Sequence, residues 1–316
     1  MKLAYKKFSE QESTIPLFSQ PWWLDLVCGE ETWDVALVKR GQEIVASMPY
    51  FTKKRGCFRY LTQPPLTQHL GPWIKVSTAK CAKQLGQQKD IMQALIAQLP
   101  KYDMFAQNWS YRHSNWLPFY WKGFSQTTRY TYVLEDLTDL DTIWSGINSN
   151  IESDIRKSES RYALTIQEDL PASDFVALNK GTFTRQGKSL PYGEAWVTRF
   201  IEEVCARGCG KTFIAVDEAG QHHAGVFIVW DQNSAYYLMG GGDPKLRNSG
   251  ATSLCMWHAI QFAATVTKKF DFEGSMLEPV ERFFRGFGAK QKPYFCISKT
   301  PSRILRLYQV CRNMRT

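Results

Sequence analysis

The feature that most constrains the fold is a regular succession of apolar segments that begins near residue 213. Three short runs, at residues 213–216, 224–230 and 235–239, are rich in β-branched and aromatic residues and are separated by turn sequences. A glycine triplet follows the third run, and a stretch that is apolar nearly all round, expected to be a buried helix, comes next. Strands that alternate with a buried helix predict an α+β fold, in which helices flank a mixed sheet.

The same alternation continues to the end of the chain. Residues 269–274 have the composition of a strand, and Pro279 begins a helix on which Phe283, Phe284 and Phe287 share one face. A further strand at residues 293–298 and a basic helix complete the predicted order. The second half of the chain is therefore expected to form one complete mixed sheet with its helices.

The first half of the chain loosely repeats a pattern of a helix followed by strands. The expected elements are an aromatic helix at 21–27, strands at 33–38 and 44–51, a helix that Pro100 ends, a strand at 102–107, a short helix at 116–121 and a strand at 130–134. The stretch at residues 61–72, rich in proline and glutamine, is predicted to be irregular. This repetition suggests a duplicated fold.

A length of 316 residues suits two domains better than one. An acidic cluster without apolar periodicity, typical of a linker, lies at residues 134–141 and contains Glu135, Asp136, Asp139 and Asp141. We therefore expect a first domain at residues 1–140 and a second domain at residues 141–316.

Charge favours anionic partners. The chain has 39 lysines and arginines against 30 acidic residues, a formal net charge of +9, which favours phosphates, nucleic acid or a membrane surface. The last 27 residues contain no acid, and their basic residues are Lys290, Lys292, Lys299, Arg303, Arg306, Arg312 and Arg315. This segment is either a solvated tail or an edge that faces an anion.

The final helix carries an apolar stripe. Ile304, Leu307, Tyr308 and Cys311 share one face, which is expected to pack onto the domain and leave the arginines outside. Contact of this helix with tRNA or with an anionic membrane surface is the alternative.

Several classes of protein are disfavoured. The 8 cysteines form no CxxC pair and no spacing with histidine that suits a metal, so we expect free thiols and no metal site. The first residues lack the apolar run of a signal peptide, and no stretch approaches the length of a transmembrane segment. The expected location is therefore cytoplasmic.

The loop between the third apolar run and the buried helix is the first candidate site. A strand that runs into a turn with glycine and then into a helix directs free backbone N–H groups at an anion. Arg247 adds a positive charge, and Gly250 is expected to let a phosphate approach the backbone. The predicted donor-phosphate site consists of Arg247, Asn248, Ser249, Gly250, Ala251 and Thr252. The alternative is a mobile hairpin loop.

Residues 247–252 are similar to the pyrophosphate loop of GNAT-fold acyltransferases, written R/Q-x-x-G-x-G/A, with Thr252 in place of the small last residue. The second half of the chain resembles the Fem-type (FemAB-like) branch of that fold, which attaches amino acids from aminoacyl-tRNA to peptidoglycan precursors, and related acetyltransferase-like proteins. This resemblance lies in segments 150–157, 236–243, 250–260, 270–275 and 281–288. It implies two tandem GNAT-like domains, the first degenerate, with acyl-CoA or aminoacyl-tRNA as a co-substrate and no tightly bound cofactor.

Two carboxylates are the candidate catalytic residues. Side chains alternate across a strand, so Asp271 and Glu273 are expected to share one face of the strand at residues 269–274. Two carboxylates on one face could deprotonate or orient an attacking amine. A structural pair bonded to backbone or to arginine is the alternative.

Other polar side chains have weaker roles. Tyr236, Tyr237 and Tyr294 could donate a proton to a leaving group, although aromatic residues in strands mostly belong to the core. His222 and His223 are expected in a solvated turn.

Arg156 and Lys157, on the polar segment that opens the second domain, are the predicted acceptor-binding residues. A solvated face of intrahelical ion pairs with Glu152 and Glu159 is the alternative.

The predicted function is transfer of an acyl or aminoacyl group from a phosphate-bearing donor, acyl-CoA or aminoacyl-tRNA, to an amine. The acceptor would be a cell-envelope or peptidoglycan precursor. A plain acyl-CoA N-acetyltransferase is a second enzyme hypothesis. The alternative from another class is a non-catalytic protein that binds nucleic acid or an anionic envelope precursor through its basic surface.

Overall fold

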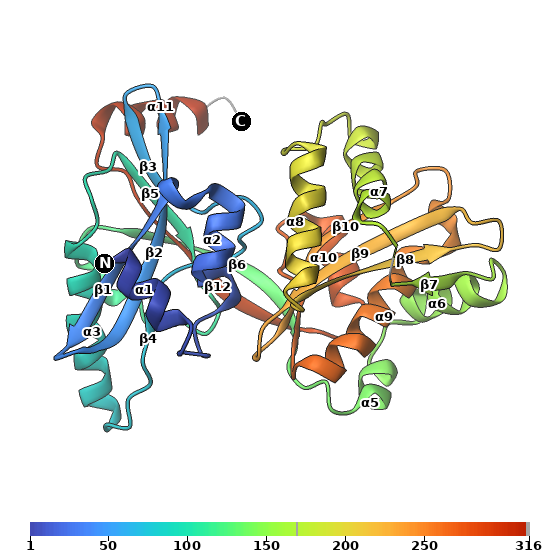
Figure 1. Ribbon diagram of the computed structural model, residues 1–316, viewed down its shortest axis with the longest axis horizontal. Helices are drawn as coiled ribbons and strands as arrows, with labels where there is room; N and C mark the ends of the chain where they lie inside the picture. The colour runs from blue at the N-terminus through green and yellow to red at the C-terminus, as the bar shows by residue number, and fades with distance from the viewer. Residues whose placement is uncertain (169, 314–316) are drawn as a thin grey trace. The chain divides into compact units, whose positions relative to one another are not determined.

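The computed structural model describes residues 1–168 and 170–313, and its contacts divide the chain into two compact units (Figure 1). The first unit contains residues 1–129 and the segment from Pro293 onward, and the second contains Tyr130–Lys292. The cut expected near residue 140 differs from this division, because the C-terminal segment returns to the first unit. There Cys296–Lys299 pair antiparallel with Phe105–Asn108, a long-range contact that local sequence pattern does not reveal.

The first unit is built around one sheet. Its strands are β1 (Trp33–Arg40), β2 (Glu43–Arg55), β3 (Phe58–Thr62), β4 (Trp73–Ile74), β5 (Met104–Asn108) and β12 (Lys290–Lys299), which enters from the second unit. Its helices are α1 (Lys2–Ser9), α2 (Pro21–Cys28), α3 (Cys81–Ala97), α4 (Leu117–Tyr120) and α11 (Arg303–Asn313), with short 3₁₀ turns at Leu17–Ser19 and Glu30–Thr32. Strand β3 and helix α1 were not predicted from the sequence.

Within this sheet β1, β2 and β3 are antiparallel neighbours, whereas β3 and β5 run parallel. The parallel contact joins only Tyr60 to Met104 and Leu61 to Phe105. Helix α3 covers one face through Ile91, Met92 and Leu95.

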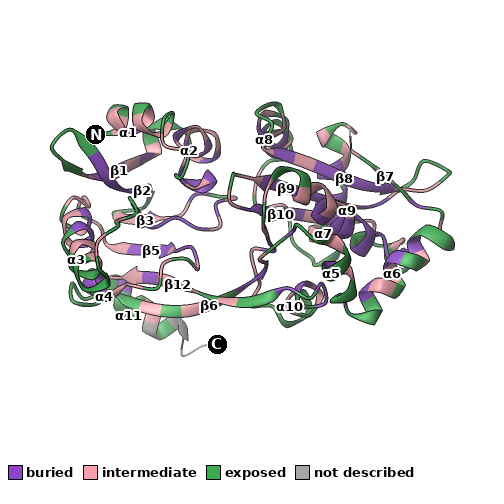
Figure 2. Cartoon of the chain, turned by 90° about the horizontal axis from the view of Figure 1, so that it is seen from below, coloured by how far each residue is buried: buried purple, intermediate pink, exposed green. Residues whose placement is uncertain are grey.

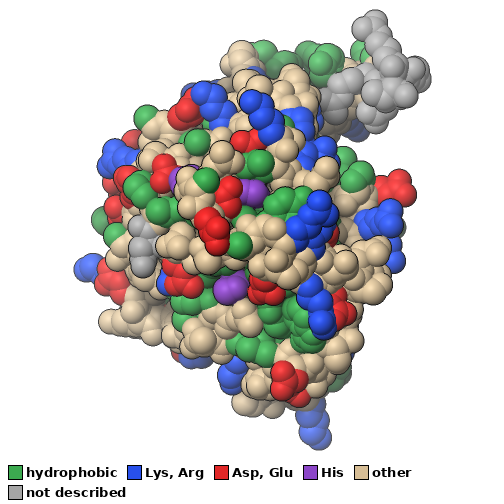
Figure 3. Space-filling view, turned by 90° about the vertical axis from the view of Figure 1, so that its right-hand side faces the viewer, with side chains coloured by type: hydrophobic (Ala, Val, Ile, Leu, Met, Phe, Trp, Pro, Cys, Tyr) green, Lys and Arg blue, Asp and Glu red, His purple; other side chains and the backbone are tan. Residues whose placement is uncertain are grey.

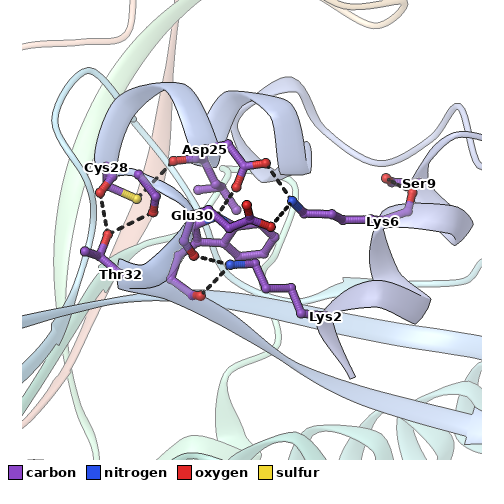
Figure 4. A network of polar contacts seen from close by, with 10 residues as sticks. Lys2, Lys6, Ser9, Asp25, Cys28, Glu30 and Thr32 are labelled. Atoms are coloured by element: carbon purple, nitrogen blue, oxygen red, sulfur yellow. Dashed lines mark hydrogen bonds and ion pairs between the residues drawn. The ribbon is translucent and has the colours of Figure 1, made fainter.

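A polar network fixes the N-terminal helix of the first unit (Figure 4). Lys6 on α1 forms ion pairs with Asp25 (2.8 Å) and Glu30 (2.7 Å), and Asp25 also accepts a hydrogen bond from the Trp33 indole (2.8 Å). These partners come from α1, α2, the following 3₁₀ turn and β1, so the network joins four elements of the N-terminal region.

The second unit contains the predicted regular segment. Its strands are β6 (Ser125–Leu134), which enters from the first unit, β7 (Thr165–Gln167), β8 (Gly210–Val216), β9 (His222–Trp230), β10 (Ala235–Gly242) and β11 (Phe270–Asp271). Its helices are α5 (Leu140–Ser145), α6 (Ser149–Ser160), α7 (Ala172–Arg185), α8 (Glu194–Ala206), α9 (Ala251–Val266) and α10 (Glu278–Arg285), with a 3₁₀ turn at Arg247–Ser249.

Strands β8, β9 and β10 form an antiparallel meander, and most of their residues are buried (Figure 2). Helix α9 packs on this meander and is buried over most of its surface, which confirms the prediction made from its apolar composition. Strand β10 extends through all three glycines that the sequence pattern assigned to the loop. Its parallel contact with β11 stops after two residue pairs, Ala235 with Phe270 and Tyr236 with Asp271.

The C-terminal helix α11 differs from its prediction. Ile304, Leu307 and Tyr308 are 69%, 67% and 63% exposed, and among the side chains of this helix that the structure describes the buried one is Leu305. The apolar stripe therefore faces solvent instead of packing onto the domain. Arg315 and the side chain of Arg312 lie outside the described residues. In the described part of the chain, no helix is both long enough and apolar enough to cross a membrane.

Candidate functional site

The loop predicted to bind phosphate borders a cavity of about 420 Å³ in the second unit. Residues of six helices and strands line it: the start of β9, the end of β10, the first turn of α9, Asp154 of α6, Thr182 and Arg185 of α7, and the face of α10 that carries Phe283 and Phe284. The cavity begins where β10 has lost its contact with β11. It therefore lies where the parallel strands β10 and β11 separate, and the first turn of α9 borders it there.

Gly250 shapes this loop for a reason that the sequence did not show. Its φ is +80°, and a Cβ atom at this position would lie 2.2 Å from the carbonyl oxygen of Asp154 on α6. The missing side chain is thus required by the backbone of α6, and not only by an incoming phosphate. At the start of α9 the amides of Ser253 and Leu254 donate to the Gly250 carbonyl, which leaves those of Ala251 and Thr252, two residues that line the cavity, as the candidates to bind an anion.

The glycines at the end of β10 are explained in the same way. A Cβ atom on Gly241 would lie 2.3 Å from the backbone nitrogen of Asn179, so α7 packs directly on the strand. Asn179 donates a hydrogen bond to the Gly240 carbonyl (2.8 Å), and the Gly242 amide donates one to the Thr182 hydroxyl (3.1 Å). Helix α7 therefore holds the strand end that forms one wall of the cavity.

The predicted phosphate-binding residues differ in what they can offer a ligand. Arg247 and Thr252 are exposed and line the cavity, so their side chains can reach a ligand. Ser249 also lines the cavity, but it is buried and its hydroxyl donates to the Leu246 carbonyl (2.8 Å). Asn248 is exposed and does not line the cavity. Arg185, at the end of α7, adds a second guanidinium that the sequence reasoning missed.

Tyr237 is the tyrosine that the structure places in this cavity. Its hydroxyl lies beside Gly240, where a Cβ atom would be only 2.1 Å away, and its ring packs edge-on against Phe284 at 5.6 Å. Burial raises the pKa of Tyr237, so its phenol keeps its proton near neutral pH and can serve as a hydrogen-bond donor. Tyr236 is buried and its hydroxyl donates to Asp231 (3.3 Å).

His223 was expected in a solvated turn, and this expectation is wrong. It lies in β9, is buried, lines the cavity, and its Nε2 is 3.1 Å from a carboxylate oxygen of Asp217. Its Nδ1 is buried without a hydrogen-bond partner among the described residues. A bulge in the β8–β9 ladder next to Val216 accounts for the difference, because it takes His223 out of regular pairing.

The carboxylates of Asp271 and Glu273 do not line the cavity. Strand β11 ends at Asp271, and Glu273 has a left-handed φ of +61°, so the expected alternation is broken between them. Asp271 is buried, accepts a hydrogen bond from the Thr131 hydroxyl, and accepts another from the Glu273 amide (2.9 Å).

Glu273 is an unusual carboxyl group. Its Oε1 is buried and has no hydrogen-bond partner among the described residues. Burial, together with the nearby charges of Asp271 and Asp231, raises the pKa of Glu273 well above its ordinary value. A strained backbone and a perturbed carboxyl group in one residue are typical of functional sites.

Arg156 and Lys157 lie on α6 with partners on the same helix. Arg156 pairs with Glu152 (2.5 Å), and Lys157 pairs with Asp154 (2.7 Å), which itself lines the cavity. Two lysines of the acid-free C-terminal segment are paired as well, because Lys290 and Lys292 both contact Glu135. On the face drawn in Figure 3, basic and acidic side chains are interspersed. The surplus charge therefore does not gather into one patch there.

Comparison with known proteins gives a family match for part of this chain. Residues 147–283 match the family model described as an acetyltransferase (GNAT) domain, and this range contains every residue that lines the cavity except Phe284. No curated protein matches the sequence.

The fold is similar to solved structures over nearly the whole chain. FemX matches with a TM-score of 0.69 and 12% identity, over 98% of this chain and 98% of that one. L-PGS from Bacillus licheniformis matches with a TM-score of 0.58 and 12% identity, over 98% and 95%. The C-terminal domain of a putative lysylphosphatidylglycerol synthetase from Agrobacterium fabrum matches with a TM-score of 0.56 and 10% identity, over 96% and 94%. The predicted α+β fold of two tandem GNAT-like units is therefore confirmed, and the fold together with the GNAT domain supports an acyltransferase.

Proposed function

We propose that this chain transfers an acyl or aminoacyl group from a phosphate-bearing donor to an amine. The observation that carries the proposal is the cavity at the end of β10. It combines the first turn of α9, the guanidinium groups of Arg185 and Arg247, and the phenol of Tyr237 in one place. Cations and helix amides bind phosphate, and a neutral phenol can protonate a leaving group.

The donor's phosphates would bind at residues 247–252. Arg247 would pair with a phosphate, and the Thr252 hydroxyl and the first-turn amides of α9 would donate hydrogen bonds. Thr252 departs from the small residue of the GNAT pattern, but its side chain is exposed and so does not disturb the packing of α9. Ser249 and Gly250 hold the shape of the loop.

The reaction would be a direct attack of the amine on the acyl carbonyl carbon. A C–N bond forms, and the C–S bond of a thioester or the C–O bond of an aminoacyl ester breaks. The leaving thiolate or ribose oxygen takes a proton from Tyr237, and the amine loses one proton to a base. A proton from water restores the Tyr237 phenol, so the protons balance over the reaction. We retain Asp271 and Glu273 as candidates to orient or deprotonate the amine. The protonated form favoured for Glu273 suits a hydrogen-bond donor, which leaves the anionic role to Asp271.

The donor would be acyl-CoA or aminoacyl-tRNA, bound as a co-substrate. The acceptor would be a cell-envelope or peptidoglycan precursor, with Arg156 and Lys157 as candidate contacts for its phosphates. The exposed apolar and basic face of α11 would suit peripheral contact with an anionic membrane surface.

The experiment is a thermal-shift comparison of acetyl-CoA, aminoacyl-tRNA and a nucleotide-linked cell-wall precursor on the wild-type chain and on Arg247→Gln. The preferred donor should raise the Tm of the wild type, and Arg247→Gln should weaken its binding about tenfold while leaving the free protein's Tm unchanged. Arg199→Gln, an exposed arginine of α8 away from the cavity, is the matched control.

No stabilisation by any donor would contradict the proposal, and so would equal binding to the wild type and Arg247→Gln. Binding of tRNA or precursor without any transfer of label to an amine would favour the non-catalytic alternative.

A further inference from the structure

A second cavity, of about 510 Å³, lies within the first unit, between helix α3 and the loop that follows β5. Its volume is in the range of small-molecule sites. Ile74, Ile91 and Met92 give it an apolar floor, and the rest of its lining is mostly polar. It shares no lining residue with the cavity proposed to bind the donor.

Positive charge exceeds negative charge around this cavity. Arg40, Lys75 and Arg112 line it, and the carboxylate among the lining residues is Glu43, which pairs with Lys75. Among the described residues, neither Arg40 nor Arg112 has an acidic side chain within ion-pair distance. Two guanidinium groups that face one cavity and have no ion-pair partner favour an anionic ligand.

Side-chain amides complete the polar wall in a fixed arrangement. Asn115 donates a hydrogen bond to Gln88 Oε1 (3.0 Å), and Gln87 Oε1 accepts one from the Ser77 hydroxyl (2.9 Å). Each of these hydrogen bonds fixes the orientation of a side-chain amide. The other polar atom of that amide, such as Gln88 Nε2 or Asn115 Oδ1, can then bond to a ligand. Paired donors and acceptors of this kind suit hydroxyl groups, which both donate and accept.

His113 adds an uncharged partner. Its ring packs edge-on against Trp109, with 6.2 Å between ring centres, and it lines the cavity. Burial and the charge of Arg112 lower the pKa of His113 to about 4, so the imidazole is neutral near pH 7. The cationic character of the cavity therefore comes from Arg40 and Arg112.

We propose that this cavity binds a small, hydroxyl-rich organic anion of the sugar phosphate class. Arg40 and Arg112 would hold the phosphate, and the amides of Gln87, Gln88 and Asn115 would hold the hydroxyl groups. The site is independent of the proposed transfer reaction, because it is built from different residues in the other unit.

The test is isothermal titration of the full chain with glucose 6-phosphate, glucose and inorganic phosphate. Glucose 6-phosphate should bind at least about tenfold more tightly than either fragment, because only it engages both the arginines and the amides. Arg112→Gln should weaken its binding by about tenfold or more. Arg55→Gln, an exposed arginine of β2 outside the cavity, and Arg247→Gln in the donor cavity should change it by less than about twofold.

Three results would overturn the proposal. They are no binding of glucose 6-phosphate, equal binding of inorganic phosphate, and binding that Arg112→Gln and Arg40→Gln both leave unchanged. Loss of binding in Arg247→Gln would instead place the anion in the donor cavity. Circular dichroism of each variant separates a loss of binding from a loss of fold, since both arginines are exposed.

Discussion

The two units differ at one shared topological position, the point where two parallel strands separate. In each unit, two parallel strands touch over only two residue pairs, β3 with β5 and β10 with β11, and a connection leads from the first strand to a helix. In the first unit the connection at residues 63–80 returns across the strand ends, and the Leu70 amide donates to the Asn108 carbonyl (2.8 Å). In the second unit the connection at residues 243–250 leaves a cavity beside the strand end.

This difference is the reason why we propose the donor site in the second unit and not in the first. Leu70 and Trp109 are buried and form a bridge where the strands of the first unit would diverge, so the chain fills its own crevice. In the second unit Gly250 and Gly241 bring α6 and α7 against the loop and the strand, which shapes an open crevice with a helix end directed into it. A duplicated fold can thus keep a site in one copy and close it in the other.

The largest effect on stability is expected for Gly250→Ala, which changes the loop beside the open crevice of the second unit. The added Cβ would meet the Asp154 carbonyl oxygen, and the φ of +80° would be strained for alanine. We expect a loss of about 3–5 kcal/mol in the free energy of unfolding, measured by urea denaturation. Gly187→Ala has a similar φ of +68° but open space around it, so it should cost only about 1 kcal/mol. Equal losses in both variants would show that α6 does not constrain the loop.

The filled crevice of the first unit is tested by Leu70→Ala. Leu70 is 3% exposed in a core cluster with Trp73, so the substitution should remove about 2–4 kcal/mol of stability. Donor binding in the second unit should not change. Leu3→Ala, at a residue that is 77% exposed, is the control and should stay within about 0.5 kcal/mol. If Leu70→Ala left the stability unchanged, Leu70 would not fill the crevice of the first unit.

A smaller effect concerns pH. The unfolded state releases the Glu273 proton as pH rises past the ordinary pKa of 4.5, whereas the folded state keeps it to higher pH. The folded state then binds more protons, so wild-type stability should fall relative to Glu273→Gln, by up to about 1.4 kcal/mol per pH unit within this window. Denaturation at several pH values between about 5 and 8 measures the difference. For Glu202→Gln, at an exposed carboxylate, the free energy of unfolding should change with pH as it does in the wild type. If the free energy of unfolding of Glu273→Gln changed with pH as it does in the wild type, Glu273 would not be buried and protonated.

The smallest effect is a stabilisation and concerns helix α3 of the first unit. Gly86 is inside α3 with open space around it, so Gly86→Ala should stabilise the chain by about 0.5–1 kcal/mol. A rise in Tm by differential scanning calorimetry measures this. A loss of stability would mean that α3 packs more tightly near its start than the structure shows.

The sequence predicted the second unit well because its elements carry strong local signals. Apolar strands with turn residues between them and an apolar helix were all confirmed, from β8 to α9. The glycines at residues 240–242 were assigned to the loop because glycine is rare in strands, and the packing of α7 against Gly241 overrides that preference. The return of β12 to the first unit is a long-range pairing, which local pattern cannot show.

The candidate site was predicted less completely. The loop at residues 247–252 follows from a strand, a glycine and a helix in order, and the structure places most of it at one cavity. His223 and Arg185 carry no local signal, because a bulge buries the first and α7 brings the second to the cavity only in three dimensions. The alternation expected for Asp271 and Glu273 fails because β11 ends after two residues and the backbone then turns into the left-handed region.

The most direct measurement of the central claim is hydrogen–deuterium exchange with and without the donor that stabilises the protein. We expect slower exchange in residues 240–254 on donor binding, and unchanged exchange in the corresponding connection of the first unit, residues 63–80. Slower exchange at 63–80 with no change at 240–254 would contradict a donor site in the second unit.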